Sequence, residues 1–181
     1  MDLAAHVLED SITQFAKLRA LADGALLQVD DIAFFAVPAE DANSIAHIIK
    51  HLAGNARSRW TDFLTSDGEK PDRDRDREFE LEAGDTRAAL MEAWEAGWQA
   101  LDTALKPLAP GDLLRTVPIR GEPHTVLVAI HRQLTHYAYH VGQIVQLAHH
   151  AKGATWKSLS VPRGKSAEFN REMARRFREK G

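Results

Sequence analysis

Hydrophobic residues along this chain recur mainly at intervals of three and four positions, the spacing of one face of an α-helix. The pattern runs from Leu3 to Val29 and predicts a first helix there, although Gly24 weakens its last turns. Pro38 interrupts the pattern, which resumes from about Asp41 to Leu64 and predicts a second helix. The first part of the chain is therefore expected to form two long amphipathic helices.

A polar, strongly charged connection follows from Ser66 to Gly84, and it is expected to lie on the surface. Its run from Asp72 to Asp76 alternates aspartate with arginine, so the charges cancel and a solvated segment is expected rather than a calcium loop. Asp85 is a suitable N-cap for a third helix, which the pattern predicts from Thr86 to about Leu105.

The strongest helical pattern comes later, from about Thr125 to Ala151, and it stops at Gly153. Two short extended pieces between Leu113 and Thr125 precede it and predict a small hairpin, and a short basic helix from Ser166 to Arg178 follows it. Four long amphipathic helices with one long crossover connection bury their apolar faces best as an all-α four-helix bundle. We therefore predict a single domain over residues 1–181.

Composition restricts the partners and the compartment. The chain carries 23 Lys and Arg against 26 Asp and Glu, and the formal charge of −3 gives no attraction to nucleic acid or to an anionic membrane. No stretch approaches about eighteen apolar residues, and the first residues lack the pattern of a signal peptide, so a cytoplasmic protein is expected. Because there is no cysteine, a site for a soft metal ion has to be built from histidine.

Two histidines four residues apart, His136 and His140, are the strongest candidates for such a site. At about 100° per residue their side chains lie about 40° apart on the longest predicted helix, at one edge of its apolar face. The same geometry turns His131 and His149 about 180° away from His140, so neither is expected to join the pair. The pair can therefore share one metal ion.

A third ligand has to come from a facing helix, and the second predicted helix offers His47 and His51. His51 lies closer to the apolar face, whereas His47 is turned about 40° further toward solvent. We therefore predict that His51, His136 and His140 bind a divalent ion, with zinc or nickel as the expected metal. The alternative explanation is that each histidine satisfies a local hydrogen bond. No carboxylate lies three residues before a helical histidine, so a di-iron centre is not expected.

Other residues flank the predicted ligands. Tyr137 falls on the apolar side and is expected in the core, Gln143 can hydrogen-bond a substrate, and Asn55 is expected to support His51. No carboxylate on either histidine-bearing helix is placed as a general base, so such a base would have to be the metal-bound hydroxide or thiolate itself, or a residue brought in by a loop. We assign no catalytic residue.

Two strings that contain these histidines resemble the DinB-like (damage-inducible) superfamily of bacterial proteins: His51-Leu52-Ala53-Gly54-Asn55 and His136-Tyr137-Ala138-Tyr139-His140-Val141-Gly142-Gln143. The resemblance covers nearly the whole chain. Three further strings are similar to a functionally uncharacterised branch of that superfamily, namely 57–63, 67–71 and 156–164. The resemblance implies a usually dimeric four-helix bundle with a divalent metal at positions 51, 136 and 140, and His47 is an additional histidine outside its pattern.

Characterised members of the superfamily include bacillithiol transferases and a mycothiol-dependent maleylpyruvate isomerase, so the resemblance implies transfer of a low-molecular-weight thiol to an electrophile. A cation held by three neutral imidazoles can stabilise a thiolate, whose parent thiol has a pKa of about 8.5. The same cation can instead deliver a metal-bound hydroxide, which makes a hydrolase the alternative. A non-catalytic metal-binding dimeric module is the third interpretation, and a fourth protein ligand would indicate it.

Overall fold

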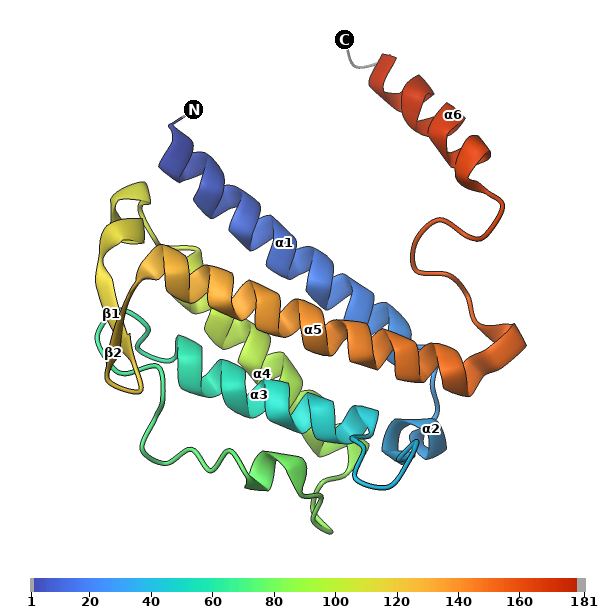
Figure 1. The fold of residues 1–181 in the computed structure, drawn as a ribbon, viewed down its shortest axis with the longest axis horizontal. Coiled ribbons are helices and arrows are strands. Elements are labelled where there is room, and N and C mark those ends of the chain that lie inside the picture. Colours follow the sequence, from blue (N-terminus) through green and yellow to red (C-terminus); the bar gives the residue numbers. More distant parts are fainter. Residues whose placement is uncertain (1, 179–181) are drawn as a thin grey trace.

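The structure, a computed structural model, describes residues 2–178 and is mostly helical (Figure 1). Four helices in this range are long: α1 (Leu3–Leu26), α3 (Ile45–Trp60), α4 (Arg87–Leu105) and α5 (Val126–Lys152). The shorter elements are α2 (Asp31–Phe35), η1 (Arg77–Phe79), η2 (Pro110–Leu114), η3 (Gly153–Thr155), α6 (Ser166–Arg178) and the antiparallel strands β1 (Thr116–Ile119) and β2 (Glu122–Thr125). The four long helices, the hairpin and the last helix were predicted, whereas α2 and the short 3-10 turns were not. None of the described helices combines the length and the apolarity needed to cross a membrane.

Capping side chains set where the helices begin. The Ser44 hydroxyl accepts a hydrogen bond from the His47 N–H, and the Ser44 N–H donates to His47 Nδ1 at 3.2 Å, so α3 begins directly after this serine. The second helix is therefore shorter at its start than the hydrophobic pattern predicts. Thr86 is the N-cap of α4. The prediction that Asp85 caps this helix was wrong, because the Asp85 carboxylate pairs with Lys50 at 2.7 Å instead.

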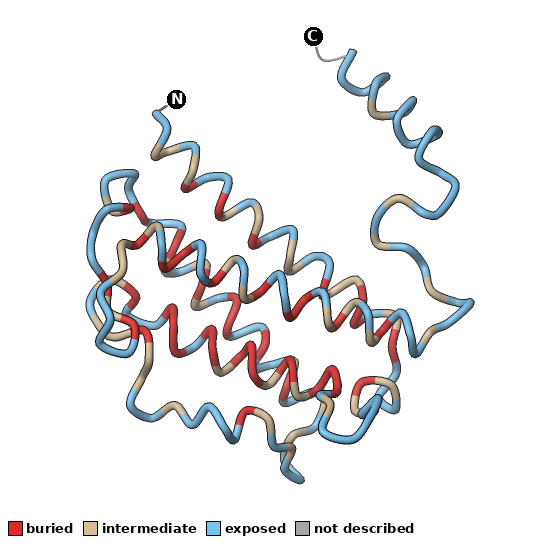
Figure 2. The backbone as a smooth tube through the Cα atoms, viewed as in Figure 1, coloured by how far each residue is buried: buried red, intermediate tan, exposed pale blue. Residues whose placement is uncertain are grey.

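The apolar faces of the four long helices meet in one core (Figure 2). Phe15 of α1 lies in this core with 1% of its surface exposed, and its ring lies edge-on to Trp60 at 5.7 Å and to Tyr137 at 5.6 Å. The Tyr137 hydroxyl accepts a hydrogen bond of 3.0 Å from Trp60 Nε1, so the polar groups of both buried rings have a partner. These contacts join α1, α3 and α5, and they confirm Tyr137 as a core residue.

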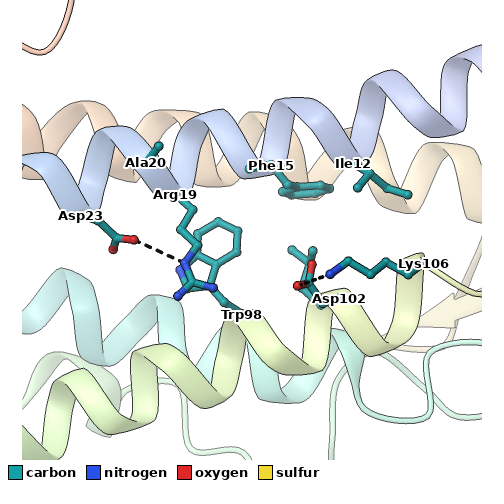
Figure 3. A pocket seen from close by; sticks show the side chains of 10 residues that line it. Ile12, Phe15, Arg19, Ala20, Asp23, Trp98, Asp102 and Lys106 are labelled. Carbon is teal, nitrogen blue, oxygen red and sulfur yellow. Dashed lines mark hydrogen bonds and ion pairs between the residues drawn. The ribbon is translucent and has the colours of Figure 1, made fainter.

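A cavity of about 280 Å³ lies between α1 and α4 (Figure 3). The guanidinium of Arg19 lies 5.9 Å from the centre of the Trp98 ring, and it pairs with Glu95 of α4. Beside it, Trp94 Nε1 donates a hydrogen bond to Asp23 at 3.1 Å. An ion pair and a hydrogen bond therefore join these two helices beside the cavity.

The β1–β2 hairpin anchors the start of the long connection between α3 and α4. The hairpin turn consists of Arg120 and Gly121, both with positive φ, as a two-residue turn between twisted strands requires. The Asp67 carboxylate accepts hydrogen bonds of 2.8 Å from the N–H groups of both turn residues. This contact places Arg120 beside the start of the connection that follows α3.

At the other end of the chain, α6 projects away from the rest of the structure and has no buried residue (Figure 1).

Gly97 allows α3 and α4 to approach closely, because a Cβ at this position would lie 2.9 Å from the Cβ of Ala56. Gly142 of α5 provides the matched control, since a Cβ there meets nothing within 4 Å. Gly142→Ala should raise the free energy of unfolding by about 0.5–1 kcal/mol through helix propensity. The free energy of unfolding of Gly97→Ala should be about 1–3 kcal/mol lower than that of Gly142→Ala, because overpacking usually costs this much. Chemical denaturation of both variants measures the difference, and equal effects would contradict the close packing.

Candidate metal centre

Three histidines gather where α3 and α5 lie side by side: His51, His136 and His140. Each offers one ring nitrogen, and these atoms all lie within 4.8 Å of one another. His51 Nε2 and His136 Nε2 are 3.1 Å apart. Two nitrogens that are each about 2.1 Å from one ion can be at most about 4.2 Å apart, so this pair is already in range and the cluster needs at most a small ring rotation. The residues predicted from sequence are thus brought together.

Glu78, from η1 in the long connection, orients the first of these histidines. Its Oε2 lies 2.8 Å from His51 Nδ1, and the Phe79 ring stacks on the imidazole with the ring centres 4.6 Å apart. An ionised carboxylate only accepts hydrogen bonds, so Nδ1 carries the proton and Nε2 keeps its lone pair. A histidine that donates one N–H to a carboxylate is the usual arrangement for a metal ligand.

Arg73 fixes Glu78 in turn. Its Nε donates to one carboxylate oxygen at 2.7 Å and a terminal nitrogen donates to the other at 2.8 Å, and the two side chains are only 2% and 8% exposed. Burial alone would raise the pKa of Glu78, but the hydrogen bonds from Arg73 and His51 hold this pKa below its usual value. Glu78 therefore stays ionised at neutral pH.

Gly54, three residues after His51, provides the space for this carboxylate. A Cβ at Gly54 would lie 2.8 Å from Glu78 Cδ, so the acidic side chain rests directly against the backbone of α3. Any other residue at this position of the helix would push Glu78 outward. The glycine within the His51–Asn55 string therefore has a steric role in the site.

His136 and His140 are held in their neutral forms. Burial, with repulsion from the neighbouring histidines, lowers the pKa of His136 to about 3 and that of His140 to about 4. His140 Nδ1 lies 2.8 Å from Gln143 Oε1 and donates to it, which leaves His140 Nε2 free. His136 Nδ1 is buried and has no hydrogen-bond partner among residues 2–178. Neutral imidazoles are the form that binds metal ions.

The remaining sequence predictions can be placed directly. His131 and His149 are exposed, as predicted. His47 is half-buried and takes part in the cap of α3, so it lies outside the cluster. Asn55 does not support His51 as predicted, because Glu78 occupies that role. Gln143 accepts a hydrogen bond from His140 of the cluster and also lines the adjoining cavity, so its predicted contact with a substrate stays a prediction.

Sequence reasoning missed Glu78 and Arg73. The expectation of a solvated charge run was right for the exposed Asp72 and Asp74, but it was wrong for Arg73. The connection between α3 and α4 is therefore more than a surface excursion, because part of it closes over the histidines. One signal was available, since the two histidine-bearing helices lack a suitable carboxylate and a loop was one possible source of an acidic residue near the site.

A cavity of about 400 Å³ adjoins the three histidines. Besides them, its lining includes Asn43, Asn55, Arg59, Arg73, Arg75, Phe79, Arg120, Arg132, Gln133, Tyr139 and Gln143. No fourth histidine or carboxylate of the described residues belongs to the cluster. The arrangement can therefore hold one ion and still admit a small molecule.

Comparison with curated proteins and with solved structures gives no match. A family model described as "Protein of unknown function (DUF1572)" matches residues 2–165. The matched range includes both helices that bear the histidines and the connection that carries Glu78. The chain therefore belongs to the DUF1572 family.

Proposed function

We propose that the protein is a divalent-metal-dependent enzyme that activates a low-molecular-weight thiol for transfer to an electrophile. The observation that carries the proposal is the cluster of His51, His136 and His140, whose ring nitrogens converge beside a cavity. Three neutral nitrogen donors fit zinc or nickel and leave positions for other ligands. The resemblance to the DinB-like superfamily supports the same proposal, and with it a four-helix bundle, a homodimer and a cytoplasmic location.

The chain's own residues prepare the site in a defined way. When bound, the ion supplies positive charge that favours the thiolate over the thiol, whose pKa is otherwise about 8.5. Glu78 keeps the proton of His51 on Nδ1 and increases the basicity of Nε2, and Gln143 fixes the ring of His140. Because Arg73 donates hydrogen bonds to both oxygens of Glu78, this carboxylate stays ionised and is not free to bind the ion directly.

Thiol transfer fits the cavity better than hydrolysis does. A metal hydrolase usually needs a carboxylate or another general base to manage protons during attack and departure. Glu78 is engaged by Arg73 and His51, and the described residues that line the cavity include no carboxylate. A thiol that binds as the thiolate releases its proton to solvent as it binds and has no further proton to lose in the transfer itself. Hydrolysis and a non-catalytic role are therefore the outcomes that the experiments below have to exclude.

The first prediction concerns metal content. Purified protein should contain about one zinc or nickel ion per chain by elemental analysis, and His136→Ala or His140→Ala should lose most of it because two imidazoles do not hold the ion as tightly. His131→Ala is the matched control, since His131 lies on the same helix but is exposed, and it should keep the full content. Full metal content in both single variants of the cluster would refute the assignment.

Gly54→Ala tests the support of His51 by Glu78. The added methyl group should displace the carboxylate, and metal affinity should fall about tenfold or more, as is usual when a hydrogen-bond partner of a metal ligand is lost. Competition with a chelator measures the affinity, and circular dichroism checks that the helices persist. Gly142→Ala should leave the affinity unchanged, because its methyl group meets open space. Wild-type affinity in Gly54→Ala would show that Glu78 has no part in metal binding.

The reaction itself can be followed by fluorescence. Metal-loaded protein should conjugate monobromobimane to bacillithiol, mycothiol or glutathione faster than protein stripped by a chelator, and His140→Ala should behave like the stripped protein. Equal rates for loaded and stripped protein with all three thiols would overturn thiol transfer. Metal-dependent cleavage of an ester or amide without conjugation would establish hydrolysis in its place.

A further inference from the structure

Positive charge is concentrated around the cavity beside the histidines. Five arginines line it: Arg59, Arg73, Arg75, Arg120 and Arg132. Two carboxylates pair with members of this set. Glu69 lies 2.9 Å from Arg59, 3.0 Å from Arg73 and 3.4 Å from Arg120, and Glu78 pairs with Arg73. Two carboxylates therefore offset only part of the positive charge of the five arginines.

The unbalanced charge lies on three separate segments. Arg132 is on α5, one turn before His136, and Arg75 is on the long connection, with its guanidinium 5.5 Å from the centre of the Phe79 ring. Neither forms an ion pair with a carboxylate within residues 2–178. Arg75 is also near enough to His140 to oppose its protonation and so to lower its pKa. Arg120, at the hairpin turn, keeps a side chain that is 53% exposed.

Unpartnered polar groups lie deeper in the same cavity. Asn55 and Gln133 are only 4% and 3% exposed, yet Asn55 Oδ1 and Gln133 Oε1 have no hydrogen-bond partner among the described residues. Arg59 is buried as well, and its Nε also has no hydrogen-bond partner among the described residues. A buried polar group left in this state costs about 1–3 kcal/mol, so several of them around one cavity indicate a place where a polar ligand binds.

We propose that this cavity binds a small molecule carrying a carboxylate or phosphate group, and that Arg75, Arg120 and Arg132 bind that anionic group while the reacting atom faces the histidines. The identity of the reacting atom rests on the proposed function, whereas the anion site does not depend on the metal. Guanidinium groups bind carboxylates and phosphates through paired hydrogen bonds and stay charged at all relevant pH values. Asn55 and Gln133 offer amide groups to the polar part of the molecule between its two ends.

A matched pair of thiols tests the proposal on metal-loaded protein. Mercaptosuccinate carries two carboxylates and thioglycerol carries none, and binding of each to cobalt-loaded protein is followed by absorption. Mercaptosuccinate should bind at least about tenfold more tightly at low salt, and the difference should shrink as salt screens the arginines. Equal affinities at every salt concentration would overturn the proposal.

Single substitutions then assign the site to its residues. Arg75→Gln and Arg132→Gln should each weaken mercaptosuccinate binding about tenfold and thioglycerol binding much less, because only the carboxylates of mercaptosuccinate pair with these arginines. Arg171→Gln is the control, since Arg171 lies on the exposed helix α6 and should have no effect on either probe. Unchanged mercaptosuccinate affinity in both cavity variants would show that these arginines do not bind the anion.

Metal-free protein separates this proposal from the proposed function. Succinate and inorganic phosphate are titrated calorimetrically into stripped protein, and binding that Arg132→Gln weakens supports the anion site even where thiol conjugation fails. The tighter of the two probes identifies carboxylate or phosphate as the preferred group. Absence of binding for both probes, together with equal affinities for the two thiols, refutes the anion site and leaves the metal assignment untouched.

Discussion

A buried chain of charge and hydrogen bonds, from Arg73 through Glu78 to His51, is the interaction on which the site depends. An ionised carboxylate that is 8% exposed is stable only when a cation and hydrogen-bond donors replace its water. Here Arg73, from the same connection, supplies the cation, and His51, from α3, supplies a further donor. Removing one member would leave the others buried without a partner. These interactions attach the long connection to α3, and they also determine that Nδ1 is the protonated nitrogen of His51.

The rest of the fold makes this contact possible by keeping α3 in a fixed position. Gly97 allows α4 to pack closely against α3, and Gly54 allows Glu78 to rest on the backbone of α3. On α5, Tyr137 faces the aromatic core while its neighbour His136 faces the cavity, so one helix joins the core to the site. Side chains held on packed helices keep their geometry better than side chains on loops. The histidines therefore lie on the rigid elements, and the loop contributes the residues that support them: a carboxylate that Arg73 holds in place and the Phe79 ring stacked on His51.

The sequence predicted those parts that depend on local periodicity. The spacing of His136 and His140 on one helical face, and the position of His51 on the edge of another, followed from about 100° per residue. Glu78 was missed because its partner His51 is more than twenty positions away and no periodic pattern links a loop to a helix over that separation. Arg73 was missed with it, because its role in the site is to bind Glu78. Within the charge run the residues look alike in sequence, and only the fold distinguishes the buried Arg73 from the exposed Asp72. The wrong cap for α4 has a similar cause. Aspartate is a good N-cap, but the Asp85 carboxylate forms an ion pair with the distant Lys50, which the local sequence does not reveal.

Electrostatics connects the metal site with the arginines around it. Like charges in a partly buried site repel, and Glu69 and Glu78 offset only part of the charge of the five guanidinium groups, so a dication held beside them would favour the entry of anions. A thiolate facing the histidines and a carboxylate or phosphate facing the arginines would relieve both parts of this repulsion at once. The same field would lower the pKa of a thiol bound there further, because every neighbouring positive charge favours the anionic form. A purely structural metal site gains nothing from unpaired arginines, whereas a site that recruits and ionises an anionic substrate uses each of them.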